Sequence, residues 1–472
     1  MSKWRWQWSA MVTLAVLLWG GIFARGDEAL VPGQIHENVA CTGHPGDSYA
    51  LYLPEIYDPA RKWPVVYFFE PAARGKLPVE KYQAVAAEFD TILIGSNTSR
   101  NYDNAAVLQA AEAMWADSRR RLAIDPERVA FCGFSGGARV SASLAGLHGG
   151  VRGVIGFGAG YQAEDPHIRQ HPFLYFAAVG VRDMNYLELK ALDRKLDRLG
   201  VTHRIVTFDD DHVWPPEEIF HSALEWLQIH DIKAGRTPRD DEWLRRVYER
   251  RWREAGRLEE IDRQLAAVEE YSHLMADFEG LLDVAGAREA TDRLQAGKVV
   301  QRAARRELEL LQFEEEIYAD LVGRFRRLRG EALTQKDLPG ARKWWQKKVT
   351  ELLAMSRRQK EPGKMRVAER MLSYIGLRAY EESVYYFRNG DFVRVALVEQ
   401  LRLLVDPRSP HAHYDLACAF ARLGETDVAL THLEQAVKNG FKRVDLLEKD
   451  DDLDNLRRLP RFERLLAGLR GE

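Results

Sequence analysis

Short apolar runs alternate with helical segments along residues 36–232, and this alternation constrains the fold more than any other feature. Most runs are continuous apolar stretches, as expected for strands buried on both faces: 64–70, 91–95, 128–133, 154–158 and 173–179. A further strand is expected at 204–208. Segment 48–54 instead alternates like a half-buried strand, and segments such as 104–121 and 186–199 are typical of helices. Strands that alternate with helices predict an α/β fold with a mostly parallel sheet covered on both faces.

The pattern changes after residue 233. Residues 233–240 are expected to form a linker, and 241–375 a helical region, because long charged segments there carry apolar residues at helical spacing. The chain has 472 residues, 46% of them hydrophobic, which is enough for two or three domains with their own cores.

A repeat is expected near the C-terminus. Gly390 and Gly424 lie 34 residues apart, and small and apolar residues recur around them. This spacing resembles the tetratricopeptide repeat, a pair of helices, over 376–443. An ordinary helical hairpin is the alternative. The helices of region 241–375 should stack on these repeats, and residues 444–472 should form further C-terminal helices.

The N-terminus, residues 1–26, has the pattern of a signal peptide. Lys3 and Arg5 precede an apolar run over 10–24, and Ala24-Arg25-Gly26 offers a cleavage site. The run is shorter than the roughly 20 residues of a spanning helix, which favours cleavage over an uncleaved membrane anchor. The protein is therefore expected to be exported, periplasmic or secreted, with no membrane span after cleavage.

Charge and cysteine content exclude several classes. The net charge is −3 and the pI near 6.5, so a nucleic-acid partner is not expected. Cys41, Cys132 and Cys418 show no C-x-x-C spacing, so we expect neither a metal site nor a disulfide framework, and their state stays open. No organic cofactor is implied either.

The strongest local motif is Gly133-Phe134-Ser135-Gly136-Gly137, which follows an apolar strand and precedes a helix of small residues. A tight turn at this place forces the serine into a strained backbone conformation and exposes its hydroxyl at the edge of the sheet. Glycines flank it because a Cβ would clash with the neighbouring strand and helix. Ser135 is therefore the candidate nucleophile.

A serine hydroxyl needs a base, and in this arrangement an acid and a histidine follow it along the chain. Asp183 comes directly after the strand ending at 179, and His212 comes after the strand ending at 208. We assign His212 as general base and Asp183 as the acid that orients it.

Other histidines and acids fit these roles less well. His203 enters a strand and His221 lies inside a helix, while 209–211 are aspartates adjacent in sequence to His212, where a hydrogen bond to Nδ1 is awkward.

The tetrahedral intermediate needs two backbone N–H donors. Gly136, after the nucleophile, should supply one, and the loop after strand 64–70 the other. Pro71 has no N–H, so Ala72 is the candidate, and Glu70 and Arg74 are expected to pair across this loop.

Residues 36–232 resemble the α/β-hydrolase superfamily, most closely the carboxylesterases grouped with polyhydroxybutyrate depolymerases and feruloyl esterases. Three stretches carry the resemblance: 133–139, Asp183 with Asn185-Tyr186, and His212 with Trp214-Pro215. The resemblance implies an α/β-hydrolase sandwich and an esterase triad. The chain departs from the group at 70–71 and 210–211, where glycines are common.

Two classes of function follow. The first is an exported serine hydrolase that cleaves small or polymeric carboxylic esters. The second is an inactive hydrolase-fold scaffold whose repeats hold a protein partner. A serine peptidase is a third alternative, because the same triad cleaves amides.

Overall fold

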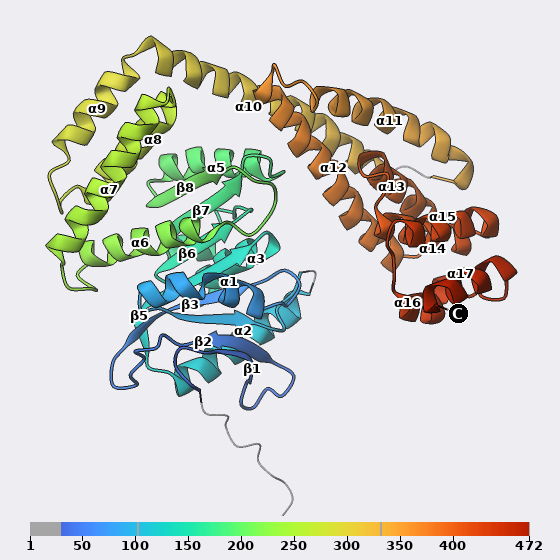
Figure 1. Cartoon of the computed structure of the whole chain (residues 1–472), viewed down its shortest axis with the longest axis horizontal. Coiled ribbons are helices and arrows are strands. Elements are labelled where there is room, and N and C mark those ends of the chain that lie inside the picture. Colours follow the sequence, from blue (N-terminus) through green and yellow to red (C-terminus); the bar gives the residue numbers. More distant parts are fainter. Residues whose placement is uncertain (1–29, 102, 331–332, 472) are drawn as a thin grey trace, which may run out of the picture.

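The computed structural model describes residues 30–101, 103–330 and 333–471, and its N-terminal part is built on one eight-stranded sheet (Figure 1). The strand order is β1-β2-β4-β3-β5-β6-β7-β8, with β2 antiparallel to both neighbours and the other pairs parallel. This is the sheet of the α/β-hydrolase fold. The strands are β1 (Ile35–Ala40), β2 (Ser48–Tyr52), β3 (Trp63–Phe69), β4 (Ile92–Ser96), β5 (Ile124–Phe134), β6 (Gly153–Phe157), β7 (Leu174–Gly180) and β8 (His203–Phe208).

Helices cover both faces of the sheet. One core cluster joins it to α2 (Asn104–Arg121), α3 (Gly136–His148), α4 (Pro166–Gln170) and α5 (Tyr186–Leu199), and another joins it to α1 (Lys76–Glu88) and α6 (Glu217–Lys233). The apolar runs of the sequence lie in β3 to β8, as predicted. Strand β1 was not predicted, because it is a polar, largely exposed edge strand with no apolar pattern.

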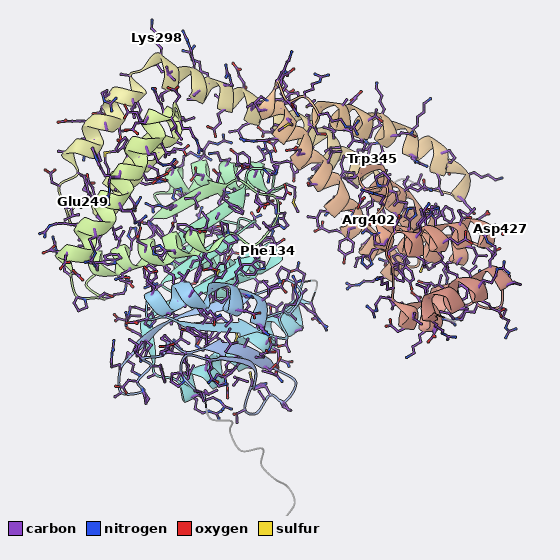
Figure 2. All side chains as sticks on the ribbon, in the orientation of Figure 1. Phe134, Glu249, Lys298, Trp345, Arg402 and Asp427 are labelled. Carbon is purple, nitrogen blue, oxygen red and sulfur yellow. The ribbon has the colours of Figure 1, made fainter. Side chains whose placement is uncertain are left out.

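The chain after residue 240 is helical wherever the structure describes it with secondary structure. Three helices, α7 (Asp241–Glu260), α8 (Gln264–Phe278) and α9 (Ala285–Gln295), follow α6. The long α10 (Lys298–Gly330) then crosses to an arm made of α11 (Leu338–Met355), α12 (Pro362–Arg388), α13 (Phe392–Val405), α14 (Pro410–Arg422), α15 (Thr426–Lys438), α16 (Val444–Lys449) and α17 (Pro460–Arg470). The arm faces the sheet domain across the concave side of the molecule, and Phe134 lies on that side (Figures 1 and 2).

The expected linker separates α6 from α7, but these helices share one core. Asp240 accepts hydrogen bonds from Glu242 N and Trp243 N, and so caps α7 where the linker ends. Ile229 and Ile232 of α6 belong to the same buried cluster as apolar residues of α7, α8 and α9. The domain boundaries stay predictions, since a shared core is compatible with several divisions of the chain.

A buried carboxylate also ties α8 to the sheet domain. Asp277 pairs with Arg204 of β8 and accepts a hydrogen bond from Arg251 Nη1 at 2.6 Å. Trp226 Nε1 of α6 donates to its other oxygen at 3.0 Å. Burial raises the pKa of the Asp277 carboxyl, but the two arginines outweigh burial and lower this pKa to about 2.

The turns at the two repeat glycines have the same hydrogen bonds. Gly390 N donates to Phe387 O, and Gly424 N donates to Ala421 O. In each turn, the backbone N–H of the residue after the glycine donates to the carbonyl oxygen five residues earlier in the chain. Both glycines have a positive φ, +68° and +81°. Such a backbone favours glycine and ends a helix tightly, so the 34-residue spacing corresponds to two equivalent turns. Assignment to the tetratricopeptide family stays a prediction.

No helix in the described ranges is long and apolar enough to cross a membrane. The predicted signal peptide, residues 1–26, lies outside the residues that the structure describes.

Replacing Asp277 by Asn should lower the free energy of unfolding by about 3–5 kcal/mol, because two buried arginines lose their carboxylate. The Asp277 pKa is lowered in the folded state, so its contribution is present above about pH 4 and is lost as the pH falls toward 2. Urea denaturation of the full chain at several pH values measures both effects. Glu289→Gln, an exposed change on α9, is the control, and equal stabilities for the two variants would contradict this role.

Candidate active site

Ser135 occupies a strained turn between β5 and α3. Its backbone has φ 54° and ψ −120°, a region that side-chain-bearing residues rarely adopt. A Cβ on Gly137 would lie 1.9 Å from Phe69 O, and one on Gly133 would lie 2.2 Å from the Gly137 backbone. The flanking glycines are therefore required by close backbone contacts, as predicted. Ser135 N donates to Phe157 O at 2.7 Å, which ties the turn to β6.

Asp183 and His212 are brought together at the same edge of the sheet. His212 Nδ1 lies 2.8 Å from Asp183 Oδ2, and the Asp183 side chain is only 1% exposed. A carboxylate accepts hydrogen bonds, so Nδ1 carries the proton and donates. Neutral His212 then has its lone pair on Nε2, the atom that can act as a base.

The second oxygen of Asp183 is also held. Asn185 N donates to Asp183 Oδ1 at 2.8 Å, and the Asn185 amide donates to Gly158 O at 2.7 Å. A Cβ on Gly158 would lie 3.1 Å from His212 Cε1 and 3.2 Å from Asp183 Oδ2. These contacts leave the carboxylate and the imidazole little freedom to turn.

The neighbouring acids have another role. Asp209 and Asp211 accept hydrogen bonds from Arg182 at 2.7 and 2.8 Å, and Arg182 N donates to Asp210 O. These three aspartates are more exposed than Asp183 and contact Arg182 rather than His212. Arg182 thus ties the loop that carries Asp183 to the loop that carries His212.

An aromatic wall supports His212. Its ring lies 4.5 Å from the Phe134 ring, centroid to centroid, and Phe134 lies 5.4 Å from Trp214. The Tyr82 hydroxyl donates to Pro215 O, which anchors the end of this loop. Ser135 follows Phe134 directly in the chain, so the strained turn lies next to the ring that contacts His212. Among the described residues no hydrogen bond joins the two side chains, a common state of such a pair before substrate binds.

The predicted oxyanion donors have different surroundings. Gly136 N is the first N–H of α3, where no intrahelical acceptor exists. Ala72 N donates to Glu70 Oε2 at 2.7 Å. The structure thus corrects the expectation for Ala72: its N–H already has a buried carboxylate partner. The predicted pair of Glu70 and Arg74 is confirmed, with Arg74 Nε donating at 3.1 Å.

The side-chain amide of Asn101 lies beside Gly136. A Cβ on Gly136 would come within 2.6 Å of Asn101 Nδ2 and 2.1 Å of Oδ1, so this amide covers Gly136. Asn101 N donates to Pro71 O at 2.9 Å, which fixes the loop to the one that carries Ala72. A half-turn of the amide exchanges its oxygen and nitrogen, and either orientation keeps the group beside Gly136.

The helical arm reaches the site through a buried arginine. Arg370 of α12 donates to Val181 O at 2.6 Å, two residues before Asp183, and its Nε donates to Glu314 of α10 at 2.7 Å. Its guanidinium stacks over the Tyr186 ring at 4.3 Å. Glu314 is fully buried and Arg370 is 6% exposed, so this pair holds α10 and α12 on the loop that carries Asp183.

One pocket contains Ser135, with a volume of about 690 Å³. Residues from the turn, from α2 and from α3 line one side, and Tyr318 of α10 and Tyr374 of α12 line the other. Neither Asp183 nor His212 is among the residues that line this pocket. Of the other histidines considered, His203 contacts Asp193, and His221 contacts Glu88. Across the described ranges, no cluster of three or more His, Cys, Asp or Glu side chains is arranged to hold a metal ion. The three cysteines are buried and unpaired.

Three groups were not found from the sequence: Asn101, Arg182 and Arg370. Asn101 lies in an irregular loop with no motif, and Arg370 is 189 residues from its acceptor. The run of aspartates at 209–211 is the only signal that could have suggested a cationic partner for that loop.

A proton resonance at unusually low field should arise from His212 Nδ1, because this proton lies between nitrogen and a buried carboxylate. Proton NMR should show that Asp183→Asn removes the signal and that Asp211→Asn, the matched control, keeps it. Loss of the signal in the Asp211 variant alone would mean that the wrong acid has been assigned. His212→Gln identifies the resonance.

No protein-family model matches the chain, and no curated protein matches it. Among solved structures, it is similar to FphF, a fluorophosphonate-binding serine hydrolase of Staphylococcus aureus, with 12% identity over 42% of this chain and 98% of that one and a TM-score of 0.35. It is also similar to a feruloyl esterase module from Clostridium thermocellum complexed with sinapinate (15% identity, 41% and 87% covered, TM-score 0.33). An S-formylglutathione hydrolase from Agrobacterium tumefaciens is a third (14% identity, 41% and 92% covered, TM-score 0.32).

Proposed function

We propose that this chain is an exported serine hydrolase that cleaves carboxylic esters through an acyl-enzyme intermediate. Ser135 is the nucleophile, His212 the general base and Asp183 the acid that orients it. The observation that carries the proposal is the strained backbone of Ser135 at the strand-to-helix turn, φ 54° and ψ −120°, at the sheet edge that also holds the Asp183–His212 pair. Strain of this kind persists where function requires it.

The reaction follows from the positions of these groups. His212 Nε2 takes the proton of the Ser135 hydroxyl as Oγ attacks the ester carbonyl. Asp183 stabilises the imidazolium that forms, through the bond to Nδ1. The C–O bond to the alcohol breaks, and His212 returns the proton to the leaving oxygen. Water then attacks the acyl-enzyme by the same route and restores Ser135.

The oxyanion of each tetrahedral intermediate would be bound by Gly136 N–H and the Asn101 side-chain amide. This choice replaces Ala72, whose N–H is taken by Glu70. Side-chain amides serve in oxyanion holes, so the substitution of one donor type for another is chemically sound.

The finer assignment rests on the sequence resemblance. A place among carboxylesterases of the polyhydroxybutyrate depolymerase and feruloyl esterase group is part of this proposal, as is export directed by residues 1–26. A serine peptidase and an inactive scaffold are the alternatives. Reactivity with a panel of acyl esters and amides separates all three.

A protein partner for the C-terminal repeats also stays a proposal. The equivalent turns at Gly390 and Gly424 support stacked helix pairs, whose concave surfaces commonly bind peptides or proteins.

Ser135→Ala should abolish ester hydrolysis and labelling by a fluorophosphonate probe while the chain stays folded, since only the nucleophile is lost.

Asp183→Asn should lower kcat by about three to four orders of magnitude, because the imidazole loses its orienting acid. Asp211→Asn should change kcat less than about threefold. Assays with a small p-nitrophenyl ester, with circular dichroism to check folding, measure these effects. Near wild-type hydrolysis by the Ser135 variant would disprove the assignment.

Asn101→Ala should lower kcat by about 10²–10³ and change KM little, the usual effect of removing one oxyanion donor. Asn104→Ala, at another residue that lines the pocket, is the matched control and should keep most of the activity. Equal kcat values for the two variants would show that Asn101 is not the donor.

A further inference from the structure

The helices that follow the sheet domain complete the pocket of Ser135, although they lie far from it in sequence. Tyr318 comes from α10, and Tyr374 and Leu377 come from α12. On this basis, and on the proposed ester hydrolysis, we propose that α10 and α12 form the specificity wall of the site, which selects uncharged esters with a large apolar group.

The arm is fixed at this position by polar contacts outside the pocket. Arg370 holds α12 on Val181 O and pairs with Glu314 of α10. Lys190 of α5 lies 3.1 Å from Glu307 of α10. Arg370 thus holds α12 against the loop that carries Asp183, and Lys190 holds α10 against α5, so the two contacts fix the two helices that form this side of the pocket.

Apolar side chains face this pocket from both walls. Leu108 of α2 and Leu147 of α3 are 41% and 49% exposed, and Tyr318 opposite is 37% exposed. Leu377 is half-buried beside them. Exposed apolar side chains that gather in one concave site mark a surface that binds an apolar group.

Four of the five charged side chains that line the pocket are paired with one another, and the fifth, Arg100, lies 3.8 Å from Asp103, which is not a lining residue. Arg139 Nη2 donates to Glu188 at 2.8 Å, and Glu188 also accepts from Gly160 N. Arg378 Nη1 donates to Glu381 at 2.9 Å. Binding a carboxylate or an ammonium group would compete with these pairs, so the pocket favours an uncharged ligand.

A volume of about 690 Å³ is within the range of pockets that enclose a drug-sized ligand, and far exceeds the space an acetyl group needs. An ester with a long alkyl or an aryl group can place its carbonyl at Ser135 and its apolar part between Leu147 and Leu377. Apolar size, rather than charge, is then what the site recognises.

The test compares p-nitrophenyl acetate with p-nitrophenyl octanoate, and methyl with octyl esters of one acid, to tell the acyl side from the alcohol side. Leu377→Ala should lower kcat/KM for the octyl-bearing ester about tenfold or more, because the group loses its contacts. Leu377→Trp fills the space and should lower it further. For the acetate, both variants should stay within about threefold of the wild type. Tyr385→Ala, on an outward part of α12, is the matched control.

Binding is measured separately from catalysis with the Ser135→Ala chain. Calorimetric titration with octanamide should give a Kd about tenfold weaker when Leu377→Trp is added, with no change for Tyr385→Ala. Equal Kd values would overturn the specificity wall even if esters are hydrolysed. A wild-type chain that hydrolyses no ester, but shows this Leu377-dependent binding, would instead disprove the hydrolase function alone. Equal kcat/KM effects on short and long esters would also overturn the wall.

Discussion

The close approach of β3, β5 and α3 is the constraint on which the rest of the site depends. At Gly133 and Gly137 the backbones come so near that no side chain fits. The chain can turn from strand to helix in this space only if the residue between them takes a positive φ, and Ser135 does so. Packing of the buried sheet supplies the free energy that maintains this strain. The hydroxyl is thereby presented at the sheet edge where the loops after β7 and β8 place Asp183 and His212.

Buried ion pairs fix the helices after residue 240 to the sheet domain. Asp277 joins α8 to β8, and Glu314 with Arg370 joins the arm to the loop of Asp183. A buried charge without its partner costs several kcal/mol, so each pair penalises separation of the two surfaces. Apolar contacts bury surface area between the packed elements, whereas these ion pairs determine which residues of the two surfaces lie opposite each other. The helical region is consequently part of what positions the acid, and it cannot be treated as an appendage of the sheet domain.

Much of the fold and of the candidate site could be predicted from local patterns in the sequence. Alternating apolar runs indicated β3 to β8, and the helices predicted at 104–121 and 186–199 have those bounds in the structure, where Asp103 caps one and Gly200 ends the other. The motif around Ser135 predicted its own backbone strain. What the sequence could not indicate depends on distant or irregular contacts. The partner of Ala72 N–H is set by how the loop folds back on Glu70, and Arg370 reaches Val181 across 189 residues.

Helix α12 explains how the site and the repeats are mechanically related. It carries Arg370, Tyr374 and Leu377 in its first and middle turns, and it ends before the turn of Gly390. From Tyr374 to the end of α12 at Arg388, a continuous helix spans about 21 Å, at 1.5 Å per residue. A helix of this length moves nearly as a rod, so a displacement of the repeats relative to the sheet domain also displaces the wall of the pocket. The buried Glu314–Arg370 pair opposes such a displacement, because moving α12 away from Val181 would leave a donor of this largely buried arginine without its carbonyl acceptor.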